Sequence, residues 1–93
     1  MSGLILTGAD VVTPDGIAQG LAVRIEGGRI AAVEAAGAGA SVDLGGGWLL
    51  PGFIDTQVNG GGGVLFNDAP DVETIARIAQ AHRRHGTTGL LPT

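Results

Sequence analysis

The alternation of apolar and polar residues predicts a β-hairpin in the first half of the chain. Apolar and polar side chains alternate over residues 21–26, which is the period of a strand with one covered face. Gly27 and Gly28 follow, and glycine tolerates the positive φ angles that a two-residue type I′ turn requires. A second strand is expected over residues 29–33. Pairing across this turn predicts one apolar face formed by Val23, Ile25, Ile30 and Ala32.

Shorter apolar runs predict further strands in the same half. They cover residues 4–6, 11–12 and 42–44, and the turn-forming sequence Thr-Pro-Asp-Gly occupies residues 13–16. Trp48 is the one tryptophan of the chain, and we expect it to be a core residue.

Pro51-Gly52 interrupts the pattern and marks the expected boundary between two domains. We therefore predict a small β-domain over residues 1–50, a hairpin or part of a sandwich, and a second domain over residues 51–93.

The second half has the pattern of a β-α-β unit. Residues 53–58 are mostly apolar on both faces, as in a buried parallel strand. A helix is expected over residues 72–85, with Asp71 as its N-cap, and a second strand over residues 87–93. The apolar stripe of the helix is expected to consist of Val72, Ile75, Ala76, Ala79 and Arg83. The overall fold class is thus α/β.

Composition excludes several classes of function. The 93 residues carry a net charge of −4, which disfavours binding to nucleic acids or anionic membranes. The chain has no cysteine and no lysine, and neither Ser2 nor Ser41 lies in a G-x-S-x-G motif. No apolar run is long enough for a membrane span, and the first residues lack a signal-peptide pattern, so a cytoplasmic protein is expected. Chemistry is left to two histidines, the carboxylates and the amides.

The most informative stretch is the strand at residues 53–58 and its continuation. Residues two apart share a face of a strand, so Asp55, Gln57 and Asn59 point the same way. Sites of parallel α/β proteins lie at the carboxyl ends of strands, where Gln57 and Asn59 occur. These two residues, with Gly60, are candidates for a pocket wall. The alternative is that the amides only tie the strand to the following loop.

Three other groups have a structural and a functional interpretation. The run Gly60–Gly63 forms either a tight turn or a phosphate-binding loop. His82 and His85 lie either at a solvated helix end or on a shared metal, and the flanking arginines favour the former. The acidic residues Asp68, Asp71 and Glu73 are explained by helix capping better than by a cation site.

Residues 51–56 and the Asn59-Gly60 pair resemble the first barrel strand of the amidohydrolase superfamily. That strand usually ends in His-x-His, whose imidazoles bind a divalent metal, whereas this chain has Gln57 and Asn59 there. The Gln-x-Asn-Gly form, the later Phe66–Asp68 and the segment 86–93 are similar to the N-acetylglucosamine-6-phosphate deacetylase family, in its N-terminal portion only. The resemblance implies that residues 51–93 begin a TIM-like (β/α)8 metal-dependent hydrolase barrel, incomplete in this chain because a full barrel needs about 250 residues.

The resemblance also implies an activity. It is the hydrolysis of N-acetylglucosamine 6-phosphate to glucosamine 6-phosphate and acetate, in amino-sugar catabolism. In the longer parent a divalent metal, zinc or similar, polarises the amide carbonyl and activates water. Its ligands and the catalytic aspartate are expected beyond residue 93. Within this chain we therefore expect no catalytic or metal-binding residue, no cofactor and no activity.

Two alternatives stay open. One is another amidohydrolase that acts on a cyclic amide, although histidines at positions 57 and 59 would have favoured it. The other is a non-catalytic structural fragment. The expected partners are a small amino-sugar phosphate in the parent and further protein chains, either as a homo-oligomer or by association through exposed barrel strands.

Overall fold

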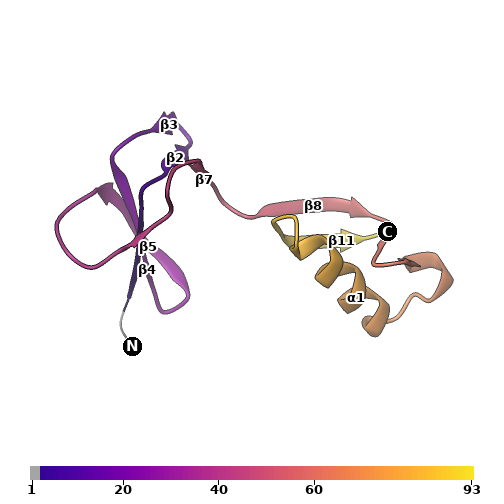
Figure 1. The fold of residues 1–93 in the computed structure, drawn as a ribbon. Helices are drawn as coiled ribbons and strands as arrows, with labels where there is room; N and C mark the ends of the chain where they lie inside the picture. The colour runs from indigo at the N-terminus through magenta and orange to yellow at the C-terminus, as the bar shows by residue number, and fades with distance from the viewer. Residues whose placement is uncertain (1–2) are drawn as a thin grey trace. The chain divides into compact units, whose positions relative to one another are not determined.

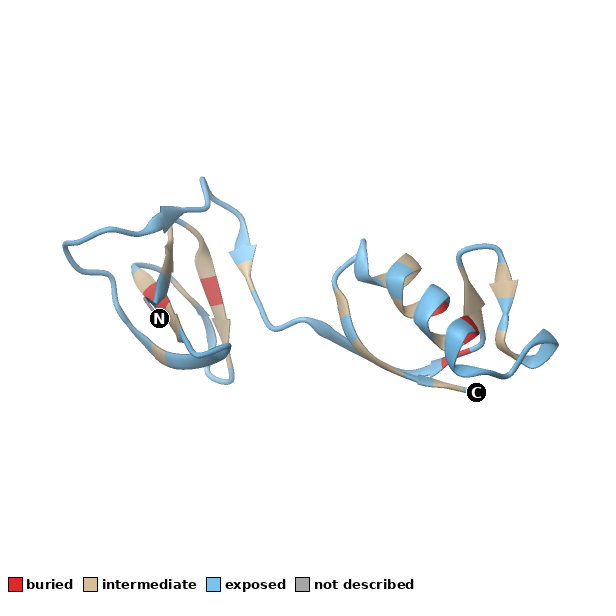
Figure 2. Ribbon diagram, turned by 90° about the horizontal axis from the view of Figure 1, so that it is seen from below, coloured by how far each residue is buried: buried red, intermediate tan, exposed pale blue. Residues whose placement is uncertain are grey.

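The structure is a computed structural model that describes residues 3–93. It consists of two compact units (Figure 1). One unit ends at Pro51, and the other spans Gly52–Thr93. Figure 2 shows that exposed and half-buried residues dominate in both units, and that each contains only a few buried positions.

The first unit consists of two small sheets. Its strands are β1 (Leu4–Thr7), β2 (Asp10–Thr13), β3 (Gly16–Ala18), β4 (Leu21–Glu26), β5 (Arg29–Ala35), β6 (Val42–Asp43) and β7 (Trp48–Leu49). The sheet orders are β5-β4-β1-β6 and β3-β2-β7. Its buried apolar side chains are Val11, Ala22 and Val23.

The predicted hairpin is formed by β4 and β5. Gly27 and Gly28 both have positive φ, at 59° and 75°, and Ile25 lies opposite Ile30 as predicted. A register shift after Arg24 pairs that residue with Ala32 and pairs Val23 with Val33. The predicted position of Ala32 on the apolar face is therefore wrong, because a bulge moves the rest of β5 by one residue and reverses its faces.

Trp48 is not a core residue. Its side chain is 65% exposed. It lies in the two-residue edge strand β7, where it pairs with Asp10 of β2. The apolar character of Trp48 suggested burial, but so short an edge strand brings little structure against the ring.

The second unit contains the predicted β-α-β arrangement. Its elements are β8 (Phe53–Val58), β9 (Gly60–Gly61), β10 (Val64–Leu65), the short 3-10 helix η1 (Phe66–Asp68), α1 (Val72–Arg83) and β11 (Thr87–Pro92). Strands β8 and β11 pair in parallel, and α1 connects them in sequence (Figure 1). The local β-α-β order is thus confirmed, and its place in a barrel stays a prediction.

The buried face of α1 differs from the predicted stripe. Ile78 is fully buried and Thr74 is 9% exposed, whereas Val72 is 82% exposed. The helix contacts β9 and β10 as well as β11, so the glycine-rich hairpin covers a face that periodicity alone assigned to the flank.

Both ends of α1 have defined caps. The Asp71 carboxylate accepts a hydrogen bond from the Thr74 backbone N–H at 2.8 Å, as predicted for an N-cap. This bond lowers the pKa of Asp71. The helix ends at Arg83 instead of the predicted His85, and Gly86 adopts a φ of 97° beyond the cap residue Arg84. Among residues 3–93, no helix is both long and apolar enough to span a lipid bilayer.

The cap predicts a specific acid sensitivity of α1. Because the folded pKa of Asp71 lies below its ordinary value of about 3.9, its stabilising contribution is complete above that value. The contribution is lost as the pH falls through the folded pKa. Asp71→Asn keeps a capping acceptor that does not titrate, and Asp71→Ala removes the cap. Helix content from circular dichroism should fall in D71A at neutral pH. Between pH 5 and pH 2, wild type should lose more helix than D71N; equal losses would contradict a capping role for the charged carboxylate.

The second unit also predicts self-association. Phe53, Ile54 and Leu91 are 53%, 73% and 57% exposed on a two-stranded sheet with open edges, and such surfaces favour pairing with another chain. Sedimentation velocity should show mass rising with concentration. Ile54→Thr should weaken association several-fold, while the control Val72→Thr, which is even more exposed but lies on the helix, should not. A monomer at all concentrations, with slow amide exchange throughout β8, would refute this expectation.

Candidate functional site

The carboxyl ends of β8 and β11 bring two polar side chains together. Asn59 directly follows β8, and Thr93 directly follows β11. The Thr93 backbone N–H donates to the Val58 carbonyl at 2.9 Å, which extends the parallel pairing by one bond. The Thr93 hydroxyl lies 3.4 Å from Asn59 Oδ1 and donates to it. Thr93 thus lies beside the candidate residue Asn59, although the sequence analysis named it only as part of the segment 86–93 and not as a site residue.

Gln57 lies one step earlier on the same strand. Its backbone N–H donates to Asp55 Oδ1 at 3.1 Å, so the half-buried carboxylate of Asp55 is held by its own strand. The Gln57 side chain is exposed, and its amide has no hydrogen-bond partner within residues 3–93. Gln57 therefore offers a free donor and a free acceptor close to the strand end.

Gly60 is turned toward the helix and the hairpin. Its carbonyl oxygen lies 2.8 Å from His82 Nε2. A Cβ atom at this position would lie 2.4 Å from the Val64 carbonyl oxygen, so no side chain fits. The structure thus shows exposed side chains at Gln57 and Asn59 and a close backbone approach at Gly60, and the role of these three residues in a pocket wall stays a prediction.

The glycine run forms the turn of a hairpin. Strands β9 and β10 pair Gly61 with Val64 and Gly60 with Leu65. Gly62 and Gly63 make the turn, with φ angles of 62° and 80°. The tight-turn interpretation of residues 60–63 is confirmed, and it repeats the two-glycine solution of the β4–β5 hairpin.

The two histidines at the end of α1 behave differently. His85 is exposed, as expected for a solvated helix end. His82 is half-buried and binds Gly60, so the same expectation is wrong for His82. Its position on the buried face of α1 could have been read from its spacing of four residues from the buried Ile78.

The residues present do not form a cation site of their own. Within the described range, no three histidine or acidic side chains are grouped so that they could hold a metal ion. The strand-end residues are neutral amides and a hydroxyl, which are weaker zinc ligands than imidazole or carboxylate. That the metal implied by the sequence resemblance is bound by residues beyond 93 stays a prediction.

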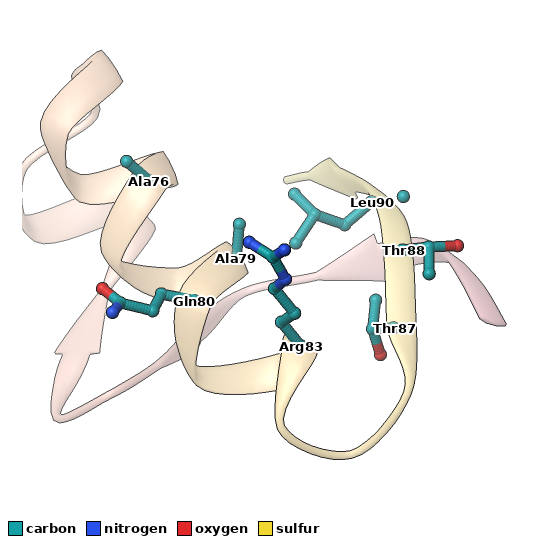
Figure 3. A pocket seen from close by; sticks show the side chains of 8 residues that line it. Ala76, Ala79, Gln80, Arg83, Thr87, Thr88 and Leu90 are labelled. Carbon is teal, nitrogen blue, oxygen red and sulfur yellow. The ribbon is translucent and has the colours of Figure 1, made fainter. Parts of the chain in front are cut away.

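A separate hollow of about 630 Å³ lies between α1 and β11 (Figure 3). It is lined by Ala76, Ala79, Gln80, Arg83 and residues 87–90. Residues 87–90 form the start of β11, whereas sites of parallel α/β proteins lie where strands end. The hollow is therefore distinct from the strand-end site.

Comparison with known proteins places these features in context. No protein-family model matches the chain. The N-acetylgalactosamine-6-phosphate deacetylase of Shewanella sp. (strain ANA-3) is 43% identical over 96 residues, which covers 97% of this chain and 24% of that protein. The N-acetylglucosamine-6-phosphate deacetylases of Haemophilus influenzae and Homo sapiens are 47% and 49% identical, each over 53 residues, or 14% and 13% of their lengths.

Two solved structures have the same fold over nearly the whole chain. The N-acetylglucosamine-6-phosphate deacetylase of Pasteurella multocida aligns with a TM-score of 0.77 and 28% identity, covering 98% of this chain and 25% of that one. A mutant of the Mycobacterium smegmatis enzyme, in complex with N-acetyl-D-glucosamine-6-phosphate, aligns with a TM-score of 0.76 and 33% identity, covering 99% and 24%.

The chain spans about a quarter of the length of the Shewanella relative and of both structures. The matched part is the N-terminal part of these proteins, and deacetylases are hydrolases. The chain is therefore homologous to the N-terminal quarter of N-acetylglucosamine-6-phosphate and N-acetylgalactosamine-6-phosphate deacetylases.

Proposed function

We propose that this chain is the N-terminal part of an enzyme that hydrolyses the acetamido group of N-acetylglucosamine 6-phosphate, giving glucosamine 6-phosphate and acetate. The observation that carries the proposal is the likeness over nearly the whole chain, at 43% identity to one sugar-phosphate deacetylase and at TM-scores of 0.77 and 0.76 to two others. In this proposal residues 51–93 form the first β-α-β unit of a (β/α)8 barrel.

The contribution of this chain to the reaction is to bind and orient. Gln57 has a free side-chain amide, and Asn59 keeps its amide donors available because its Oδ1 accepts from Thr93. Such groups recognise hydroxyl and acetamido groups by hydrogen bonds without adding charge. The divalent metal and the groups that bind it belong to the rest of such an enzyme, because residues 3–93 offer no ligand set.

The galacto epimer is the second candidate substrate. The Shewanella relative, which matches 97% of this chain, is named for N-acetylgalactosamine 6-phosphate. The two sugars differ only in the configuration at C4, so a site that distinguishes them must recognise the orientation of one hydroxyl group. The relatives are named for acetamido sugar phosphates, which counts against the alternative of a cyclic-amide substrate. The other alternative, a non-catalytic structural fragment, stays open for the 93-residue chain by itself.

The proposal includes the cellular setting. A phosphorylated sugar carries charge and does not cross a bilayer unaided, so we propose that the enzyme acts in the cytoplasm. Its second class of partner would be further copies of itself, since the β8–β11 sheet has open edges and exposed apolar side chains.

A chimera tests the proposed function. This chain replaces the matching N-terminal part of the Shewanella relative, and acetate release is measured with both epimers of the substrate. The chimera should deacetylate at least one of them, and the ratio of the two kcat/KM values identifies the preferred sugar. Asn59→Ala should lower kcat/KM on the order of tenfold, the effect of one lost hydrogen bond.

The matched control is Asn67→Ala, because Asn67 is an exposed amide in η1 without a side-chain hydrogen bond in the described residues. The 93-residue chain alone, with added Zn²⁺, should release no acetate. A chimera with the circular dichroism spectrum and oligomeric mass of its parent, but without activity on either sugar, would overturn the proposal.

A further inference from the structure

His82 connects helix α1 to the glycine hairpin by a defined hydrogen bond. Its Nε2 lies 2.8 Å from the carbonyl oxygen of Gly60, 22 residues earlier in the sequence. A carbonyl oxygen only accepts, so Nε2 must carry the proton. The imidazole is therefore held either as the neutral Nε2–H tautomer or as the cation.

Steric contact reinforces this bond. A Cβ atom at position 61 would lie 2.8 Å from His82 Nε2 and 3.1 Å from its Cδ2. At Gly62 a Cβ atom would lie 3.4 Å from both the Ala81 Cβ and the Arg77 carbonyl oxygen. The hairpin backbone thus rests directly on the last turns of α1. Because Gly61 does not have a positive φ, its lack of a side chain is required by the ring of His82 and not by its own conformation.

The β9–β10 hairpin needs a stabilising contact from outside its own two strands. Each of its strands has two residues, and all four positions of the run 60–63 are glycine. Short hairpins are marginally stable by themselves, and glycine loses the most backbone entropy on ordering. A hydrogen bond from a helix supplies a fixed point that this backbone cannot supply alone.

The hairpin is continuous with the strand-end site. The Asn59 carbonyl accepts from the Phe66 backbone N–H at 2.7 Å, which closes the hairpin on Asn59. Asn59 also accepts the Thr93 hydroxyl through its side chain. The bond at Gly60 is therefore one peptide unit away from the amide that we assign to substrate binding.

We propose that His82 is a positioning residue, which holds Gly60 through its Nε2–H and thereby sets the place of the Asn59 amide at the ends of β8 and β11. The effect on catalysis rests on the proposed function. The effect on the hairpin does not, and the two are measured separately.

The first experiment uses the 93-residue chain. His82→Leu removes the donor and keeps the bulk, whereas His82→Gln keeps an N–H donor at a similar reach. Nitrogen NMR of wild type should show His82 with a protonated Nε2. Amide exchange over residues 61–66 should rise on the order of tenfold in H82L and return to within a few-fold of wild type in H82Q.

The matched control for this experiment is His85→Leu. His85 is the other histidine of the helix end, and it is exposed. The control should leave exchange in the hairpin unchanged, and circular dichroism should show the same helix content in all variants. Unchanged exchange in H82L, or an Nδ1–H tautomer in wild type, would overturn the proposal.

The steric contact provides an independent variant. Gly61→Ala should displace the ring and raise exchange in the hairpin as H82L does. Its control is Gly37→Ala in the other unit, where a Cβ atom would meet nothing within 4 Å. Equal exchange in G61A and wild type would show that the ring does not occupy this place, against the proposal.

The second experiment uses the chimera. H82L should lower kcat/KM about five- to tenfold, and H82Q should restore most of the loss. In the double variant H82L/N59A the loss should equal that of N59A alone, because both changes remove the same positioned group. Additive losses would overturn the positioning role. If the unsubstituted chimera is inactive, the proposed function fails, and the exchange data decide the role of His82 in the hairpin by themselves.

Discussion

The packing of α1 on a run of glycines determines the organisation of the second unit. A helix approaches another backbone closely only where side chains are absent, and Gly61 and Gly62 provide that surface for the last turns of α1. The buried side of the helix contains Thr74, Ile78 and the half-buried His82, whereas Val72 is exposed. The same contact orients the hairpin that follows β8. The strand-end site therefore depends on a helix whose residues lie outside it.

The sequence predicts those features that depend on local backbone chemistry. Two adjacent glycines after an alternating strand predicted the β4–β5 hairpin, and Asp71 predicted the start of α1. The bulge beyond Arg24 has no comparable local signal, because a one-residue shift in register depends on what each face covers. The buried face of α1 was missed for a related reason. Periodicity identifies apolar positions, but the buried face also includes Thr74 and the half-buried His82, which contacts the glycine hairpin.

In the candidate site too, the local features are predictable from the sequence, and the long-range contacts are not. The spacing of two residues along a strand predicts Gln57 and Asn59 on one face, and parallel pairing brings Asn59 beside Thr93. The contacts of Thr93 and His82 join residues 34 and 22 positions apart, and the resemblance of segment 86–93 to a family did not indicate which side chain Thr93 would meet. Long-range hydrogen bonds of this kind require the fold to be known first.

The apolar stripe predicted for α1 has a different explanation. Ala76, Ala79 and Arg83 belong to that stripe, and they line the hollow beside β11. The described residues cover the face of α1 that lies toward the hairpin, whereas the hollow beside β11 leaves part of the predicted stripe uncovered. That these stripe residues form a packing surface stays a prediction. A helix in a parallel α/β architecture packs against its own strands and against neighbouring helices. An amphipathic pattern therefore shows which positions are apolar, but not which neighbour covers them.

The chemical character of the strand end is consistent with a positioning role. Gln57, Asn59 and Thr93 are neutral, and each offers directional hydrogen bonds without competing for a cation. The selectivity of such a site depends on fixed geometry, because an amide that rotates freely distinguishes little between two hydroxyl configurations. Asn59 gains that geometry from Thr93 on one side and from the hairpin held by His82 on the other. Under the function proposed for this chain, an amide fixed from both sides is suited to distinguish epimers that differ at one carbon, and the helix would then contribute to specificity without touching the sugar.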